Sequence, residues 1–401
     1  MGTPIIGAAA QVPAWVPPTD VERALFEAKA RRDWDGYLRV LFAAPTFAYA
    51  PRQLVDDDQL IAWVPHTAAH GPRYLAVYTR GELTTPRAGE VACAIALPLA
   101  PYVWWGEKLR GMVVNPGTPT EAFFPGARRK RRRWLALRDQ TPSREAAGEA
   151  AAGALLTKYT GPLRGRLAMG LACGAHLSVH RRALWNDLTD VYADYRADTR
   201  ILREAWGASS RAQWRRQLDF LLRGRNSPPQ PEFVLRVRRG IARGAPGRPV
   251  DPRLWQRAAA ETLYERGATE SELVEARELI QRILRYEARF RADGLLPPDG
   301  HVASATGYDF GRAVSVARWG LGARYADRAE VEAAVIRAGS LCRRHYTSWS
   351  DFSAGYVLGR VLRFDEEAFG PMYASALAPH RILLDTPGSP WRTLDFATPG
   401  A

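Results

Sequence analysis

The chain has 401 residues, of which 46% are apolar, 10% aromatic and 24% charged. This composition is typical of a globular protein with a large core, and the length favours two domains. No apolar run of about 18 residues occurs, so no membrane span is expected, and no basic region precedes the N-terminal apolar residues as in a signal peptide.

The formal net charge of +14 is concentrated in the middle of the chain. Residues 127–253 carry 27 Lys and Arg against 11 Asp and Glu, whereas residues 1–126 and 254–401 each have one more acidic than basic residue. Such a local excess favours an acidic protein or another polyanion as partner. Only four of the 56 basic residues are lysines, so a coding bias toward arginine is an alternative explanation.

Residues 20–126 are predicted to form a small α/β domain. Thr19 and Glu22 have the spacing of a capping box at the start of a helix, and a second helix is expected over Asp35–Ala43. Asn115-Pro116-Gly117 predicts a turn. The expected strands are Thr46–Ala50, Leu60–Val64, Tyr74–Tyr78 and Met112–Val114.

Residues 127–165 are interpreted as an exposed linker rich in Ala and Gly, with a short helix around Ala146–Lys158. Six consecutive basic residues open the linker, and their mutual repulsion opposes burial. Together with the adjacent Trp134 they form the predicted polyanion-binding site, because Lys and Arg bind phosphates without regard to base sequence. The six residues are Arg128, Arg129, Lys130, Arg131, Arg132 and Arg133.

Residues 166–396 are predicted to form a larger, mostly α-helical domain, which gives the whole chain an α+β fold with two domains. Apolar residues recur at helical spacing, interrupted by Pro and Gly at Asn226–Pro231 and Arg243–Pro252. Gly355 and Gly359 predict a close approach between helices. The expected helices are Arg166–His180, Trp185–Trp206, Arg211–Leu222, Pro252–Arg266, Glu270–Asp293, Asp309–Leu321, Arg328–His345 and Ser350–Phe364.

Two segments of the first domain carry a family resemblance. They are Leu75-Ala-Val-Tyr-Thr-Arg-Gly-Glu-Leu and Val113-Val114-Asn115-Pro116-Gly117-Thr118, and a pair of helices precedes them. With these features residues 20–126 resemble the SseB amino-terminal domain, a module that is often fused to other domains in actinobacterial proteins.

The second domain shows a further resemblance in seven segments. These are Trp206-Gly207-Ala208-Ser209-Ser210-Arg211, Asp309-Phe310-Gly311-Arg312, Arg318-Trp319-Gly320, Tyr346-Thr347-Ser348-Trp349, Gly355-Tyr356, Gly359-Arg360 and Ser389-Pro390-Trp391. Residues 166–396 thereby resemble the bacterial domain-of-unknown-function family twelve-sixty-six. Where members of that family often have Gly-His-Arg, this chain has Gly224-Arg225-Asn226. The resemblance implies a mostly helical domain and no established activity.

A polar cluster is predicted where the helices of this domain meet. Asp309 and Arg312 are three residues apart and can face each other on a helix. The cluster is interpreted either as a packing network, because buried charges need partners, or as a cleft that presents guanidinium groups to an anionic ligand. Its members are Asp309, Arg312, Arg318, Trp319, Ser348, Trp349, Tyr356 and Arg360.

Motifs of known catalytic sites are missing from the sequence. It has no nucleophile elbow, phosphate loop or dinucleotide fingerprint, so no catalytic residue and no cofactor are predicted. His176 and His180 share a helix face but lack a third ligand for a metal. The cysteines Cys93, Cys173 and Cys342 fit no disulfide framework, and a reducing cytoplasm is the expected compartment.

The leading hypothesis is therefore a non-enzymatic bacterial adaptor that binds a protein or a ligand. The alternative is an enzyme of undescribed type that acts on a phosphate-bearing substrate. A third hypothesis is nucleic-acid binding through the basic linker. In the enzyme alternative the cleft gathers Asp309, Arg312, Arg318, Trp349 and Arg360.

Overall fold

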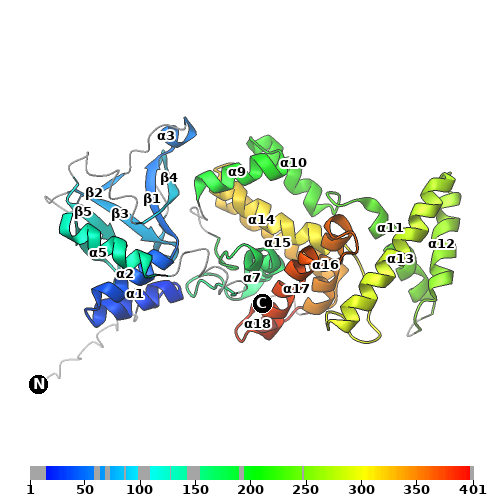
Figure 1. Ribbon diagram of the computed structural model, residues 1–401. Helices are drawn as coiled ribbons and strands as arrows, with labels where there is room; N and C mark the ends of the chain where they lie inside the picture. Colours follow the sequence, from blue (N-terminus) through cyan, green and yellow to red (C-terminus); the bar gives the residue numbers. More distant parts are fainter. Residues whose placement is uncertain are drawn as a thin grey trace, which may run out of the picture.

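The computed structural model describes residues 15–57, 64–67, 73–84, 87–97, 109–126, 128–141, 154–188, 194–245 and 248–397. These residues form a mixed α+β fold, with a six-stranded sheet in the N-terminal half and helices in the C-terminal half. Figure 1 shows the sheet and its helices at one end of the molecule and the other helices extending away from it. We refer to residues 15–141 as the α/β part and to residues 154–397 as the helical part.

The elements of the α/β part are α1 (Asp20–Ala30), α2 (Trp34–Ala43), β1 (Thr46–Pro51), α3 (Arg52–Asp56), β2 (Pro65–Thr67), β3 (Arg73–Thr79), the short 3-10 helix η1 (Arg80–Glu82), β4 (Glu90–Ile95), β5 (Gly111–Val114), β6 (Ala122–Pro125) and α5 (Arg128–Asp139). The helices of the helical part are α7 (Gly165–Cys173), α8 (Ala175–His180), α9 (Tyr195–Trp206), α10 (Arg211–Leu222), α11 (Pro229–Gly244), α12 (Pro252–Tyr264), α13 (Glu270–Ala292), α14 (Gly307–Gly322), α15 (Arg328–His345), α16 (Trp349–Phe364), α17 (Pro371–Asp385) and α18 (Pro390–Thr393).

The strands follow the order β4-β1-β3-β5-β6, and β2 pairs with β3 beside this path. Only the pairing of β3 with β5 is parallel among the described strands. Successive side chains of β1 point to opposite faces of the sheet. Ala48 packs with α1, α2 and α5, whereas Phe47 and Tyr49 form a small aromatic cluster on the other face.

The strands predicted at 46–50, 74–78 and 112–114 are confirmed as β1, β3 and β5. Residues 60–63 of the fourth predicted strand lie outside the described residues. β2, β4 and β6 were not predicted, because β2 has three residues and because Pro or Glu stands at the ends of these short strands.

The predicted capping box at the start of α1 is only half correct. Thr19 is the N-cap and its side chain accepts a hydrogen bond from the Val21 amide at 3.2 Å. Glu22 is fully buried and accepts hydrogen bonds from the Thr19 hydroxyl, the Thr79 hydroxyl and the Gly81 amide. Its carboxylate therefore makes a tertiary contact with the end of β3 in addition to the local one with Thr19.

Within the segment predicted as an exposed linker, residues 128–139 form the helix α5, which was not predicted. The helix is fixed because Trp134 and Leu137 are buried in the same core cluster as α1 and α2. Residues 154–158 are not helical, and the rest of the helix expected at 146–158 lies outside the described residues.

Two apolar clusters fill the helical part. The larger cluster joins α7, α8, α9, α10, α14 and α15 with parts of α16, α17 and α18, and the smaller joins α11, α12 and α13 with other parts of α16 and α17. Helix α14 lies at the centre, and all 16 of its residues are buried. Helices α7 and α15 touch through glycines, since a Cβ added at Gly339 would lie 2.9 Å from the Cα of Gly170.

Several helix predictions are confirmed to within two or three residues, while two are wrong in part. The helix expected at 166–180 is broken at Gly174, where a Cβ would approach Val314 of α14 to 2.6 Å. The helix expected at 185–206 begins only at Tyr195. Helix α11 starts at Pro229, inside a segment predicted as a break, because proline is tolerated in the first turn. Helix α17 was not predicted.

One contact between the two parts of the structure is made by a tyrosine of α9. The Tyr195 ring shares a buried cluster with Ala50, Val91 and Cys93 of the sheet region, and its hydroxyl donates to Asp56 Oδ1 at 2.6 Å. The contact has both an apolar and a polar component, which fixes α9 against the edge strand β4.

A buried ion pair holds the smaller apolar cluster together. The Arg238 guanidinium of α11 donates two hydrogen bonds to Glu287 of α13, at 2.9 and 2.7 Å, and lies 4.3 Å from the centre of the Trp255 ring of α12. Both groups also bind the backbone of Val302. One arginine thus links three helices and the segment that leads to α14.

We predict that Arg238→Met lowers the free energy of unfolding by about 3–5 kcal/mol, because Glu287 would stay buried without its partner. Denaturant titration of the full chain measures this loss. The double variant Arg238→Met/Glu287→Leu should recover most of it, since it removes both charges. A double variant as unstable as the single one would contradict this account.

Candidate functional site

The predicted polar cluster centres on Asp309, which is fully buried in the first turn of α14. Its Oδ2 accepts the backbone amides of Asn226 and Ser227, both at 3.0 Å, and its Oδ1 accepts the Ser227 hydroxyl at 2.6 Å and the Arg312 guanidinium. Four donors therefore surround one carboxylate. They fix the loop between α10 and α11, which follows the Gly224 turn.

Arg312 completes this arrangement with aromatic neighbours. Its guanidinium lies 3.8 Å from the centre of the Tyr308 ring and 5.5 Å from that of Trp206, and its Nε donates to the Tyr308 carbonyl at 3.3 Å. The side chain is almost completely buried. Charge pairing and cation–π contacts thus compensate for the lost hydration of Arg312.

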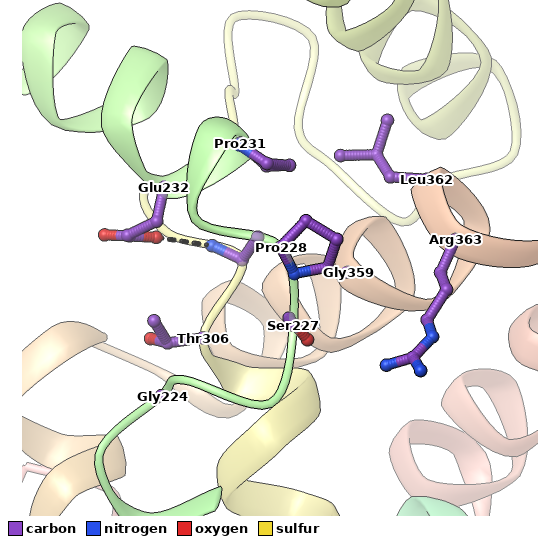
Figure 2. A pocket seen from close by; sticks show the side chains of 10 residues that line it. Gly224, Ser227, Pro228, Pro231, Glu232, Thr306, Gly359, Leu362 and Arg363 are labelled. Carbon is purple, nitrogen blue, oxygen red and sulfur yellow. Dashed lines mark hydrogen bonds between the residues drawn. The ribbon is translucent and has the colours of Figure 1, made fainter. Parts of the chain in front are cut away.

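A small cavity lies beside this network (Figure 2). Its volume is about 40 Å³, enough for a few water molecules but not for a substrate. Glu232 on its wall is already bound, because its carboxylate accepts the Ala305 amide at 3.1 Å, the Ser304 hydroxyl and the Arg239 guanidinium. Pro228, Pro231 and Leu362 give the cavity an apolar lining, and Arg363, which also lines it, donates to the Asn226 carbonyl at 3.3 Å.

The other predicted members of the cluster lie elsewhere. Arg318 donates to the Leu184 carbonyl at 2.7 Å and to the Ser178 hydroxyl at 3.2 Å, and the Trp319 ring packs against the guanidinium of Arg181. These contacts hold the segment before α9. At residues 184 and 185 the backbone carbonyl groups bind Arg318 in place of helical amide groups.

The members from α16 are likewise separated. Ser348 is an exposed N-cap that accepts the Asp351 amide at 3.1 Å, and Trp349 stacks on Trp391 with ring centres 5.6 Å apart. Arg360 donates to the Ser375 hydroxyl of α17 at 2.9 Å. The structure therefore brings Asp309 and Arg312 together and distributes the other side chains over several helix contacts.

The predicted close approach at Gly355 and Gly359 is present, though it involves a loop as well as a helix. A Cβ at Gly359 would lie 2.7 Å from the Ala305 carbonyl oxygen and 2.7 Å from the Cβ of Tyr308. At Gly355 a Cβ would meet the Ser304 carbonyl and the Tyr346 hydroxyl. The two glycines let α16 pack directly on the start of α14.

A buried histidine pair was not predicted from the sequence. His176 Nε2 and His380 Nδ1 each lie 2.9 Å from the hydroxyl oxygen of Ser353. A serine hydroxyl has one proton, so it can donate to one ring and accept the N–H of the other, and the ring that accepts is neutral. Burial holds the pKa of His176 well below its ordinary value, and burial lowers the pKa of His380 to about 4.

The spacing of His176 on an apolar helix face was the only sequence signal for this pair, and it pointed to His180 instead. His176 also stacks on Tyr356, with ring centres 4.3 Å apart. Within the described ranges, no three His, Cys, Asp or Glu side chains come together as a metal site, and no helix is long and apolar enough to cross a membrane.

The predicted polyanion-binding residues lie in the first half of α5. The Lys130, Arg132 and Arg133 side chains are exposed, and Arg133 pairs with Asp35 of α2 at 2.6 Å. The basic run is therefore part of a helix that is packed in the α/β part.

A large groove lies between α11, α12 and α13. Its volume is about 570 Å³, within the range of ligand and peptide sites. Phe233, Leu263 and Leu279 contribute apolar surface. Charged side chains of both signs stand beside them, namely Arg236, Arg266, Glu272 and Glu275.

We predict that Asp309→Asn lowers the free energy of unfolding by about 3 kcal/mol, because Arg312 loses its buried counterion and an amide group meets two backbone N–H donors. Ser348→Ala, at an exposed helix cap of the same predicted cluster, should cost only about 1 kcal/mol. Denaturant titration compares the two. Equal losses would contradict the central role of Asp309.

We also predict that acidification destabilises the fold through the histidine pair. Since the folded-state pKa of His380 is about 4 and its ordinary value is 6.5, the unfolded chain binds more protons between these pH values. Stability is therefore lost as the pH falls from about 6.5 to about 4, by about 3 kcal/mol for this residue. Denaturant titrations across this range should show a flatter pH dependence for His380→Gln. An unchanged slope would exclude the pair as its origin.

The comparison with known families supports the resemblance of the C-terminal region. The model of a family described as "Protein of unknown function (DUF1266)" matches residues 201–396, just under half of the chain. The match begins inside α9 and covers the Asp309 network and the groove, but it leaves out α7 and α8, which share the core of α14. No curated protein and no solved structure matches the chain.

Proposed function

We propose that the protein is a non-enzymatic adaptor whose helical domain, residues 166–396, binds a peptide segment of a partner protein in the groove between α11, α12 and α13. The groove is the main observation behind the proposal, because it is open to solvent while Asp309 and Arg312 are buried. In this proposal residues 20–126 form a second domain, and their SseB resemblance and the cytoplasmic location remain predictions.

The chemistry of the groove favours a helical peptide. Apolar side chains at helical spacing on a peptide can pack against Phe233, Leu263 and Leu279, and the flanking charges can pair with charges on the peptide. The guanidinium of Arg266 lies 5.3 Å from the centre of the Phe233 ring, which leaves its N–H groups available at the rim. A carboxylate on the peptide is the natural partner for this arginine.

Two exposed apolar side chains lie close to groove residues in the sequence. Tyr264, at the end of α12, is 74% exposed, and Val274 on α13 is 40% exposed. A bound peptide would extend past the groove toward the turn between α12 and α13.

The enzyme alternative receives less support. Asp309, Arg318 and Trp349 are buried in separate contacts, so the five side chains proposed for a cleft do not converge on one opening. The cavity next to Asp309 is too small for a phosphate-bearing substrate. The alternative therefore lacks the geometry on which it was based.

We predict that Leu279→Arg abolishes partner binding without unfolding the protein, because Leu279 is half-buried in the groove and its replacement fills the space. The measurement is cross-linking mass spectrometry on the full chain in cells that express it, with a photoreactive residue at position 263. Peptides of one partner should be cross-linked to the wild type and lost in the variant.

The matched control is Leu163→Arg, which makes the same change at an exposed leucine far from the groove in the sequence. Its cross-links should equal those of the wild type. If the partner peptides persist in Leu279→Arg at an unchanged melting temperature, or if none is ever cross-linked at position 263, the groove is not the binding site.

A further inference from the structure

Helix α5 is a rigidly held basic helix. Its buried side, Trp134 and Leu137, packs in the core with α2, and polar contacts link its middle and its C-terminal end to α2, Arg133 with Asp35 and Gln140 with Arg39. The apolar side is thus already occupied by the protein itself. Insertion of this helix into a lipid bilayer would require its removal from that core.

The charges of α5 oppose the stability of the helix. Six basic residues fill its first half, its first turn has no acidic residue, and the macrodipole disfavours cations at this end. Like charges three and four residues apart repel each other as well. Residues 1–126 otherwise carry almost equal numbers of acidic and basic side chains, so the positive surface here comes from α5. A local arrangement that folding does not favour points to a binding role.

An exposed tryptophan lies next to these charges. The Trp34 ring is 45% exposed and packs edge-on against Phe124, with ring centres 6.2 Å apart, and Phe124 in turn contacts Trp134 of α5 at 6.1 Å. The ion pair between Arg133 and Asp35 places the guanidinium beside the residue that follows Trp34. A flat aromatic surface therefore stands beside the basic end of α5, on a rigid support.

We propose that α5 and Trp34 together bind single-stranded nucleic acid. Lys130, Arg132 and Arg133 would contact successive phosphates, and one base would stack on the Trp34 ring. Arginine suits this task, since its guanidinium binds a phosphate with two hydrogen bonds, and a phosphate can replace Asp35 as the partner of Arg133. A duplex offers no unstacked base to Trp34, so single strands are bound more tightly.

The first test is a double charge reversal, Lys130→Glu/Arg132→Glu, in the full chain. Binding of a fluorescein-labelled oligothymidylate of about 20 nucleotides is followed by fluorescence anisotropy at several salt concentrations. The variant should bind at least tenfold more weakly, and the slope of log affinity against log salt should fall by about 1.4, which corresponds to two lost phosphate contacts. Its melting temperature should rise or stay constant, because acidic residues suit this end of the helix.

The matched control is Arg253→Glu/Arg257→Glu, which removes the same charge from exposed positions near the start of α12. This control should bind as the wild type does. If both double variants lost the same affinity for the oligothymidylate, the loss would be due to net charge alone, and the proposal would be overturned. Unchanged binding in the α5 variant would overturn it directly.

The second test is Trp34→Leu, which keeps an apolar contact with Phe124 but removes the stacking surface. Affinity for the oligothymidylate should fall about tenfold, with the salt slope unchanged. The proposal fails if this variant binds normally, if a duplex binds as tightly as the single strand, or if vesicles of anionic phospholipid compete equally well with the oligonucleotide.

Discussion

The enclosure of α14 on every side is the constraint on which the helical part depends. A helix with all 16 residues buried must satisfy its charged side chains within the protein, since water does not reach them. Asp309 and Arg318 meet this requirement by binding the backbone of irregular segments, the first at residues 226–227 and the second at residues 184–185. The buried charges thus determine where the surrounding chain changes direction.

This arrangement separates the interior chemistry from the binding surfaces. The buried polar side chains of the predicted cluster bind other groups inside the protein, whereas the groove of α11–α13 and the basic side chains of α5 are exposed to solvent. Figure 1 shows α5 and α12 at opposite ends of the molecule. In the functions proposed above, the peptide and the nucleic acid would therefore bind at separate places on the molecule.

Local sequence signals predicted those elements whose boundaries are set locally. Helices α10 and α15 were predicted to the residue, because Ser210 and Asp327 cap their first turns. The signals failed where tertiary contacts dominate. Nothing local shows that Glu22 binds the end of β3, or that Trp134 and Leu137 hold the basic run in a helix against α2.

The same limit applies to the candidate site. The spacing of Asp309 and Arg312 predicted their pairing, because it depends on one helix turn. The groove, the histidine pair and the surroundings of Trp34 each combine segments that are distant in the sequence. The periodicity of apolar residues along the chain does not predict such contacts. Net charge alone pointed to α5, but not to its rigid attachment.

The glycine contact between α7 and α15 affects whether the region matched by the family model can be expressed as a separate fragment. An excised fragment of residues 201–396 would lack α7, so that Gly339 and the apolar side chains around it would face solvent. Such a fragment would tend to aggregate during expression. The stretch that the family model matches is therefore shorter than the piece of chain that closes this core.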